Sequence, residues 1–207
     1  MAEKLGEIKK PPADNYQSGR KLYFIPLLFC GAESPPEYLG KFNTYWDQVK
    51  NQINDLELKL GKVNKIYHEL VPSGGEGAHE IIKELNDKSY QLIKACLDKG
   101  AQLEAIEETE LLTEFMDWSR CLTVGLQNQQ VLTRIYEAYL EVDNKRNQYI
   151  TGKIDETLQA DEIGILLMKE GHQVQFPQDI QVFYVAPPAL DEIKRWLRDR
   201  QAETTKD

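Results

Sequence analysis

The sequence predicts a helix-rich α/β protein, in which a small mixed sheet formed by both ends of the chain carries a projecting bundle of long helices. Two observations predict this class. Short apolar runs rich in aromatic and branched residues lie near both ends, whereas the middle carries apolar residues at helical spacing. We expect one domain over residues 21–200, a flexible lead-in over 1–20 and a polar tail over 201–207.

The first third of the chain predicts a strand, a long helix and a second strand. Residues 21–29 (KLYFIPLLF) are typical of a buried strand, although Pro26 favours an edge or a bulge. Apolar residues then step by three and four positions over a helix expected at 35–61. This heptad seam consists of Leu39, Phe42, Trp46, Val49, Ile53, Leu56 and Leu60. The second strand, at 63–71, is expected to run parallel to the first through a right-handed crossover.

The middle of the chain, over 78–159, predicts three further helices. The apolar spacing ends the first of them at Gly100 and places the third at about 128–158. This third helix repeats the three-and-four step of the first long helix, through Leu132, Ile135, Tyr139, Val142, Arg146 and Tyr149. Facing seams on 39–60 and 132–149 would form an antiparallel coiled-coil pair about 30 Å long, within one chain or across a dimer.

Two strands and an amphipathic helix are expected to close the chain. The strands are expected at 162–168 and 180–187, where short apolar runs return after the helical region. The predicted order is therefore β-α-β-α-α-α-β-β-α.

The composition excludes several classes of function. A net charge of −9, from 34 acidic and 25 basic residues, argues against a nucleic-acid binder, whose affinity depends on Lys and Arg. The three cysteines form no CxxC pair, which favours the reduced thiols of a cytoplasmic protein. No apolar run has the length of a membrane span. We therefore expect a soluble, cytoplasmic protein with no membrane partner, no direct DNA contact and no cofactor.

The most unusual stretch is VPSGGEGAHEII, at 71–82. It lacks the lysine of a GxxxxGK[ST] phosphate loop and the spacing of GxGxxG. Lys83 stands where HExxH needs its second histidine, and no GxSxG turn is present, so neither a metal site nor a catalytic residue is predicted. The stretch is either a strand-to-helix joint or a functional loop. The residues of this candidate loop are Ser73, Gly74, Gly75, Glu76, Gly77 and His79.

A secondary candidate is His172, in a polar loop between the last two predicted strands. Active-site residues are often found in such loops, but a turn histidine hydrogen-bonded to backbone is the favoured interpretation. An enzyme whose site forms between the 73–80 and 171–175 loops is therefore one alternative for the function.

The segment GGEGAHEIIKELNDKSYQLIK resembles the tip loop and following helix of archaeo-eukaryotic peptide chain release factors and their ribosome-rescue relatives. The segment RNQYITGKIDETLQADEIGILLMKEGHQV is similar to a helix-strand portion of the same superfamily. The resemblance implies that Gly74 and Gly75 correspond to the glycines of the GGQ motif, and that the ribosome is a partner. Glu76 then stands at the glutamine whose backbone amide helps to position water for peptidyl-tRNA hydrolysis. The chain departs from the family pattern in this glutamate and in a following helix that is not basic.

Taken together, these patterns predict a protein without a catalytic site, which associates with itself or with another protein through its heptad-patterned helices. The quality of the seams, set against the absence of any convergent polar motif, leads to this prediction. A translation-associated factor distantly related to release factors and an enzyme are the alternatives.

Overall fold

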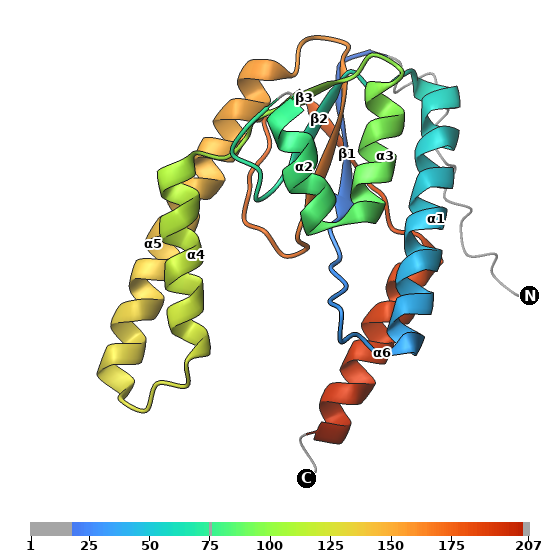
Figure 1. Ribbon diagram of the computed structural model, residues 1–207. Helices are drawn as coiled ribbons and strands as arrows, with labels where there is room; N and C mark the ends of the chain where they lie inside the picture. The colour runs from blue at the N-terminus through green and yellow to red at the C-terminus, as the bar shows by residue number, and fades with distance from the viewer. Residues whose placement is uncertain (1–17, 75, 205–207) are drawn as a thin grey trace, which may run out of the picture.

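The computed structural model describes residues 18–74 and 76–204, which form five strands and six helices (Figure 1). The strands are β1 (Arg20–Pro26), β2 (Lys65–His68), β3 (Gln102–Glu104), β4 (Ile163–Met168) and β5 (Ile180–Tyr184). The helices are α1 (Pro36–Leu60), α2 (Glu76–Leu85), α3 (Asp87–Leu97), α4 (Thr109–Thr123), α5 (Gln129–Thr157) and α6 (Pro188–Thr204).

The helix-rich α/β class is confirmed, but the expected mixed sheet is wrong. The strand order is β3-β2-β4-β1-β5, and every pairing among the described strands is parallel. The segment between β4 and β5 carries the chain past β1 instead of turning it back, so that β5 runs in the same direction as its neighbour. The prediction also missed β3, whose three residues are too few to show a period.

Helices cover both faces of the sheet, because the connections between strands change direction. The two crossovers from β1 to β3 move toward one edge, whereas the α4–α5 crossover moves back. Since each parallel crossover is right-handed, the two sets of helices lie on opposite faces. One core packs α1, α2, α3 and α6 on the sheet through residues such as Tyr23 and Trp46. The other packs α5 on the opposite face through residues such as Phe24 and Ile150.

The predicted pairing of the two long helices within one chain is wrong for the same reason. Helix α1 packs on α6 and α3, whereas α5 packs on α4 on the other side of the sheet. Within the seam, Phe42, Trp46, Val49 and Ile53 are buried in the chain's own core, and Leu39 is 46% exposed. Most of the seam is therefore closed to a partner while the protein stays folded. What does project from the domain is the antiparallel hairpin of α4 and the first half of α5 (Figure 1).

Several predicted boundaries hold, and others change. The helix expected before Gly100 divides at Asn86, whose side chain caps α3 by accepting hydrogen bonds from the backbone of Lys88 and Ser89. The expected tail begins inside α6, which runs to Thr204. Most of the expected lead-in, Gly75 and the last three residues of the tail lie outside the described residues. Within the described part of the chain, no helix is both long and apolar enough to cross a membrane.

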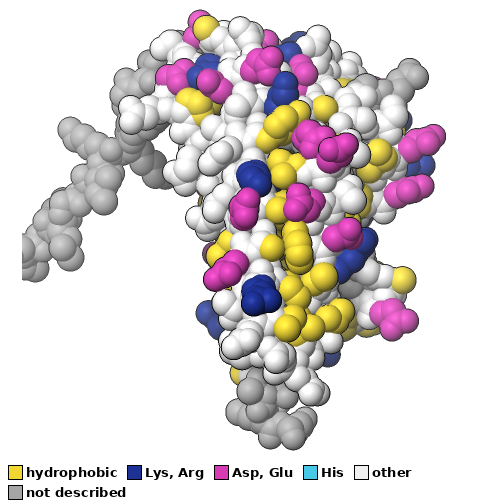
Figure 2. Space-filling view, turned by 90° about the vertical axis from the view of Figure 1, so that its left-hand side faces the viewer, with side chains coloured by type: hydrophobic (Ala, Val, Ile, Leu, Met, Phe, Trp, Pro, Cys, Tyr) yellow, Lys and Arg dark blue, Asp and Glu magenta, His cyan; other side chains and the backbone are white. Residues whose placement is uncertain are grey.

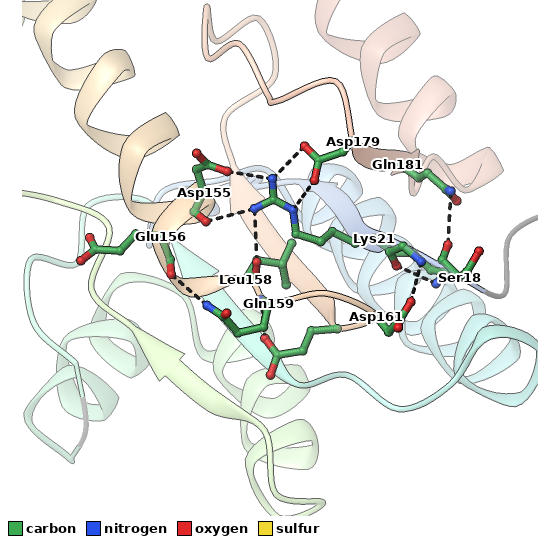
Figure 3. A network of polar contacts seen from close by, with 12 residues as sticks. Ser18, Lys21, Asp155, Glu156, Leu158, Gln159, Asp161, Asp179 and Gln181 are labelled. Atoms are coloured by element: carbon green, nitrogen blue, oxygen red, sulfur yellow. Dashed lines mark hydrogen bonds and ion pairs between the residues drawn. The ribbon is translucent and has the colours of Figure 1, made fainter.

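A network of hydrogen bonds and ion pairs around Arg20 lies at the amino-terminal edge of the sheet (Figure 3). Its guanidinium donates to both carboxylate oxygens of Asp179 at 2.8 Å and to Asp155 Oδ1 at 2.7 Å. Its Nη1 donates to the carbonyl oxygens of Asp155 and Leu158 at 3.0 and 3.2 Å. These bonds join β1 to the end of α5 and to the segment before β5.

Candidate functional site

The glycine-rich candidate loop lies between β2 and α2, at the carboxyl-terminal edge of the sheet. Ser73 is half-buried, and Gly74 is exposed to solvent. A Cβ atom at Gly74 would lie 3.2 Å from the carbonyl oxygen of Leu103, which is closer than most side chains tolerate. Glu76 begins α2, Gly77 is exposed on it, and Gly75 lies outside the described residues. The close approach to β3 is a structural reason for glycine at position 74.

The two candidate histidines lie against different cores. The ring of His79, on α2, is 6.4 Å from that of Tyr90, which packs on the α1 side of the sheet. The ring of His172 is 4.8 Å from Phe24 and 5.9 Å from Phe176, which belong to the α5 side. The structure therefore does not bring the two histidines together, and the shared enzyme site gains no support from their positions.

A cavity of about 220 Å³ lies at the carboxyl-terminal edge of the sheet, at the base of the α4–α5 hairpin. The chain leaves β2 toward one face of the sheet and β4 toward the other, so this is a switch point of the kind where α/β proteins bind ligands. Its polar lining consists of Glu69, Ser119, Tyr139, Asp143, Arg146, Asn147, Lys169 and His172. Of these, only His172 was a sequence candidate.

A buried ion cluster joins the hairpin to the sheet beside this cavity. Arg146 on α5, Glu69 after β2 and Glu107 before α4 are 3%, 4% and 3% exposed. Arg146 Nε donates to Glu107 Oε2 at 2.9 Å, and its Nη2 donates to Oε1 of the same carboxylate. Nη2 also lies 3.5 Å from Glu69 Oε2. The guanidinium carbon lies 4.6 Å from the centroid of the Phe115 ring, a cation–π contact.

Backbone groups hold both carboxylates in place. Glu69 accepts a hydrogen bond from the backbone N–H of Lys169, and Glu107 accepts one from Leu70 at 3.0 Å. Leu70 has a φ of +66°, in the left-handed region that is unfavourable for a non-glycine residue. The bond to Glu107 is one of the contacts that keep the chain in this conformation at the cavity wall.

Two carboxylates share one guanidinium, and this sets the local electrostatics. Burial raises the pKa of Glu69, and the positive charge of Arg146 only partly opposes the effect. Burial by itself lowers the pKa of Arg146, but the bonds and charge of Glu107 outweigh it and raise the pKa. Burial lowers the pKa of His68 to about 4. Burial and then the charge of Arg146 lower the pKa of His172, which favours its neutral form at the cavity wall.

Sequence reasoning missed Glu69 and Glu107, and it read Arg146 as a seam residue. Two signals pointed toward this cluster. An arginine at a heptad core position needs a partner, and an acidic residue directly after a buried strand lies at the edge where ligands bind. Among the described residues, no group of three or more His, Cys, Asp or Glu side chains is arranged to hold a metal ion.

The projecting hairpin carries a second candidate surface. Figure 2 faces this side of the molecule and shows hydrophobic side chains gathered in a stripe, with acidic and basic side chains beside it. Several large apolar residues of the hairpin are exposed: Met116, Val124, Val131, Tyr136 and Leu140. A two-helix hairpin has no third layer against which such residues can pack.

Comparison with known proteins gives this chain no relative: no family model, no curated protein and no solved structure matches it. The resemblance to release factors therefore stays a prediction from the quoted segments.

Proposed function

We propose that the protein is a non-enzymatic binding module that docks another protein on its α4–α5 hairpin. The observation that carries this proposal is the tip of the hairpin, which has no charged residue between Arg120 and Arg134 in a chain whose charged fraction is 29%. Val124, at 69% exposed, and Val131, at 42%, lie in this uncharged segment. The tip also exposes the amides of residues 127–130, so it is uncharged but not wholly apolar. Exposed apolar side chains without neighbouring charges are typical of a docking surface.

Burial of the valines at the tip against a partner would stabilise the complex. Full burial of a valine side chain contributes about 1.5–3 kcal/mol relative to leaving it in water. Gly125 has a φ of +71°, a left-handed conformation that glycine adopts easily, and the chain turns there. This turn places Val124 at the end of the hairpin.

The charge of the hairpin indicates which kind of partner fits it. Residues 109–145 contain six acidic and three basic residues, a net charge of −3. A second copy would bring an equally acidic hairpin, and anionic membranes or nucleic acids would be repelled as well. We infer that the partner is a protein with an apolar groove rimmed by basic residues.

The test is a binding measurement with a matched control. A partner captured at low salt by cross-linking at the hairpin is purified and titrated against the full chain by calorimetry. Val124→Asp should weaken binding by about tenfold or more, because it places a charge in the apolar contact. The control is Leu58→Asp, at an 86% exposed position on α1, and it should leave the affinity unchanged.

Two results would contradict the proposal. The first is equal affinity for the Val124→Asp variant and the native chain. The second is a concentration-dependent dimer in sedimentation that Val124→Asp abolishes, in place of a monomer of 23.9 kDa. That result would assign the tip to self-association.

A further inference from the structure

The buried guanidinium of Arg146 leaves one donor unbonded at the cavity below the hairpin. Arg146 is 3% exposed and lines this cavity. Its Nε and Nη2 donate to Glu107, whereas its Nη1 donates to no described residue. Nη1 is not one of the wholly buried side-chain atoms that lack a partner, so it retains accessible surface. Polar groups in such a setting are nearly always paired, so an acceptor in the cavity would complete the bonding of Nη1.

His172 supplies a second donor to the same cavity. Its Nδ1 accepts a hydrogen bond from the backbone N–H of Val174 at 3.2 Å, which places the hydrogen of the neutral ring on Nε2. Nε2 bonds to no described residue and is not wholly buried. Two N–H groups that lack acceptors at one cavity match the two lone pairs of a carbonyl oxygen.

The charges around the cavity favour a neutral ligand over a carboxylate. Three carboxylates act on the one buried guanidinium, those of Glu107, Glu69 and Asp143. The carboxylate of a ligand would add a further negative charge to this group. Lys169 lines the cavity but is exposed, so water screens its positive charge. The cavity therefore suits an acceptor without a net charge.

Asp143 and an aromatic wall extend the match from a carbonyl group to an amide. Asp143 is half-buried at the cavity, and only its Oδ2 is bonded to a described residue. Its Oδ1 is available to accept from an N–H group of the ligand. The rings of Phe115 and Tyr139, which also line the cavity, have centroids 5.5 Å apart. They form an apolar surface for the rest of the ligand.

We propose that this cavity binds a small neutral carboxamide. The carbonyl oxygen of the ligand accepts from Arg146 Nη1 and His172 Nε2, and its N–H group donates to Asp143. The cavity of about 220 Å³ is large enough for an aromatic amide such as benzamide, since a cavity of about 150 Å³ holds benzene. This site is distinct from the docking tip, and it does not depend on the proposed partner.

The experiment is a ligand series that keeps the phenyl ring and changes the head group. Benzamide, thiobenzamide, benzoate and benzylammonium are titrated separately into the full-length protein, with amide chemical shifts in NMR spectra as the readout. Benzamide should bind with a dissociation constant on the order of millimolar. Thiobenzamide, whose sulfur is a weak acceptor, should bind about fivefold more weakly. Benzoate, which is repelled by the carboxylates, and benzylammonium, which has no acceptor, should each bind about tenfold more weakly.

Variants locate the site. His172→Phe removes the Nε2 donor but keeps a ring against Phe24, and it should weaken benzamide binding by about fivefold. Asp143→Asn keeps an acceptor for Asn147 and removes one negative charge, so it should shift the affinity ratio about tenfold from benzamide toward benzoate. The matched control is Glu141→Gln, at an exposed position on the same helix, and it should change neither affinity. Circular dichroism on each variant establishes that it is folded.

Four results would overturn the proposal. Tighter binding of benzoate than of benzamide to the native chain would make the cavity an anion site. Tighter binding of benzylammonium would mean that the carboxylates select the ligand. Equal binding of benzamide and thiobenzamide would show that the carbonyl oxygen, and hence both donors, has no role. No chemical-shift change with any probe would mean that water alone occupies the cavity.

Discussion

An arginine cluster lies at each end of the parallel strands, one at the amino-terminal edge of the sheet and one at the carboxyl-terminal edge. The two clusters differ in burial. At the amino-terminal edge, the side chains of Asp155 and Asp179, which pair with Arg20, are 54% and 66% exposed. At the carboxyl-terminal edge, the side chains of Glu69 and Glu107, which pair with Arg146, are 5% and 1% exposed. The first cluster is therefore hydrated, and the second is shielded from water.

The clusters also differ in how completely they are bonded. All three guanidinium nitrogens of Arg20 donate to a described residue, whereas Nη1 of Arg146 donates to none. The amino-terminal cluster thus joins α5 and the segment before β5 to β1. At the carboxyl-terminal edge, Glu69 and Arg146 line the cavity of about 220 Å³. This comparison predicts that mutations and pH changes at the carboxyl-terminal edge alter the free energy of unfolding strongly. Mutations at the amino-terminal edge should alter it weakly, and their effect should depend on salt.

The largest effect is expected for Arg146→Met. Methionine fills a similar volume but leaves Glu69 and Glu107 buried without a counter-ion. Removing one partner of a buried ion pair costs about 3–5 kcal/mol, and we expect the free energy of unfolding at neutral pH to fall by that amount. Urea denaturation followed by circular dichroism measures it. The neighbouring variant Lys145→Met, at an exposed position, is the control and should keep the native midpoint; equal midpoints for both variants would contradict the role of the cluster.

The next effect concerns the pH dependence that His68 gives to the same edge. Its folded pKa of about 4 lies below the ordinary value of 6.5. Between pH 6.5 and about 4, His68 is protonated in the unfolded chain but stays neutral in the folded chain. The contribution of neutral His68 to the free energy of unfolding is therefore complete above pH 6.5 and is lost as the pH falls toward about 4. The loss should approach about 3 kcal/mol.

His68→Asn removes this titration while keeping a donor near the Glu69 carbonyl oxygen, which lies 2.6 Å from His68 Nδ1. The free energy of unfolding of this variant, measured by urea denaturation across the acid range, should fall less steeply than that of the native chain. Parallel curves for the two proteins would show that His68 does not contribute to acid sensitivity.

A smaller effect distinguishes the two glutamates that share Arg146. Glu107→Gln loses a charged, doubly bonded partner of the guanidinium and should lower the free energy of unfolding by about 2 kcal/mol. Glu69→Gln removes the carboxylate whose pKa burial already raises, and it keeps an acceptor for Lys169. It should stay within about 1 kcal/mol of the native protein at neutral pH. Equal losses in urea denaturation would show that the two carboxylates share the guanidinium equally.

The long helices could be predicted from the sequence because their apolar spacing recurs over many turns. The helix expected at 35–61 is Pro36–Leu60, and the helix expected at 128–158 is Gln129–Thr157. Which neighbour each helix packs on could not be predicted in the same way. A heptad seam looks the same whether it faces a coiled-coil partner or a sheet, and the handedness of the crossovers decides which neighbour it meets.

The candidate site could not be predicted because its residues are distant in the chain. Arg146 and Glu107 are separated by 39 positions, and only the fold places them beside each other. The heptad position of Arg146 indicates that it is buried, but no local pattern identifies Glu107 as its partner. The glycine loop, in contrast, stood out locally, although the close approach to β3 explains only the glycine at position 74.

A small effect is also expected at the amino-terminal edge, for Arg20→Met. The two carboxylates and two carbonyl groups that lose their donor can turn to water, so the loss should be about 1 kcal/mol. Salt should separate the two edges further. Because the Debye length is only about 3 Å at 1 M salt, the stability gap between native and Arg20→Met chains should shrink in concentrated potassium chloride. The gap for Arg146→Met should persist there, since ions do not reach a buried cluster. Urea denaturation at low and high salt measures both, and a salt-independent Arg20 gap would mean that its hydrogen bonds, and not its charge, hold that edge together.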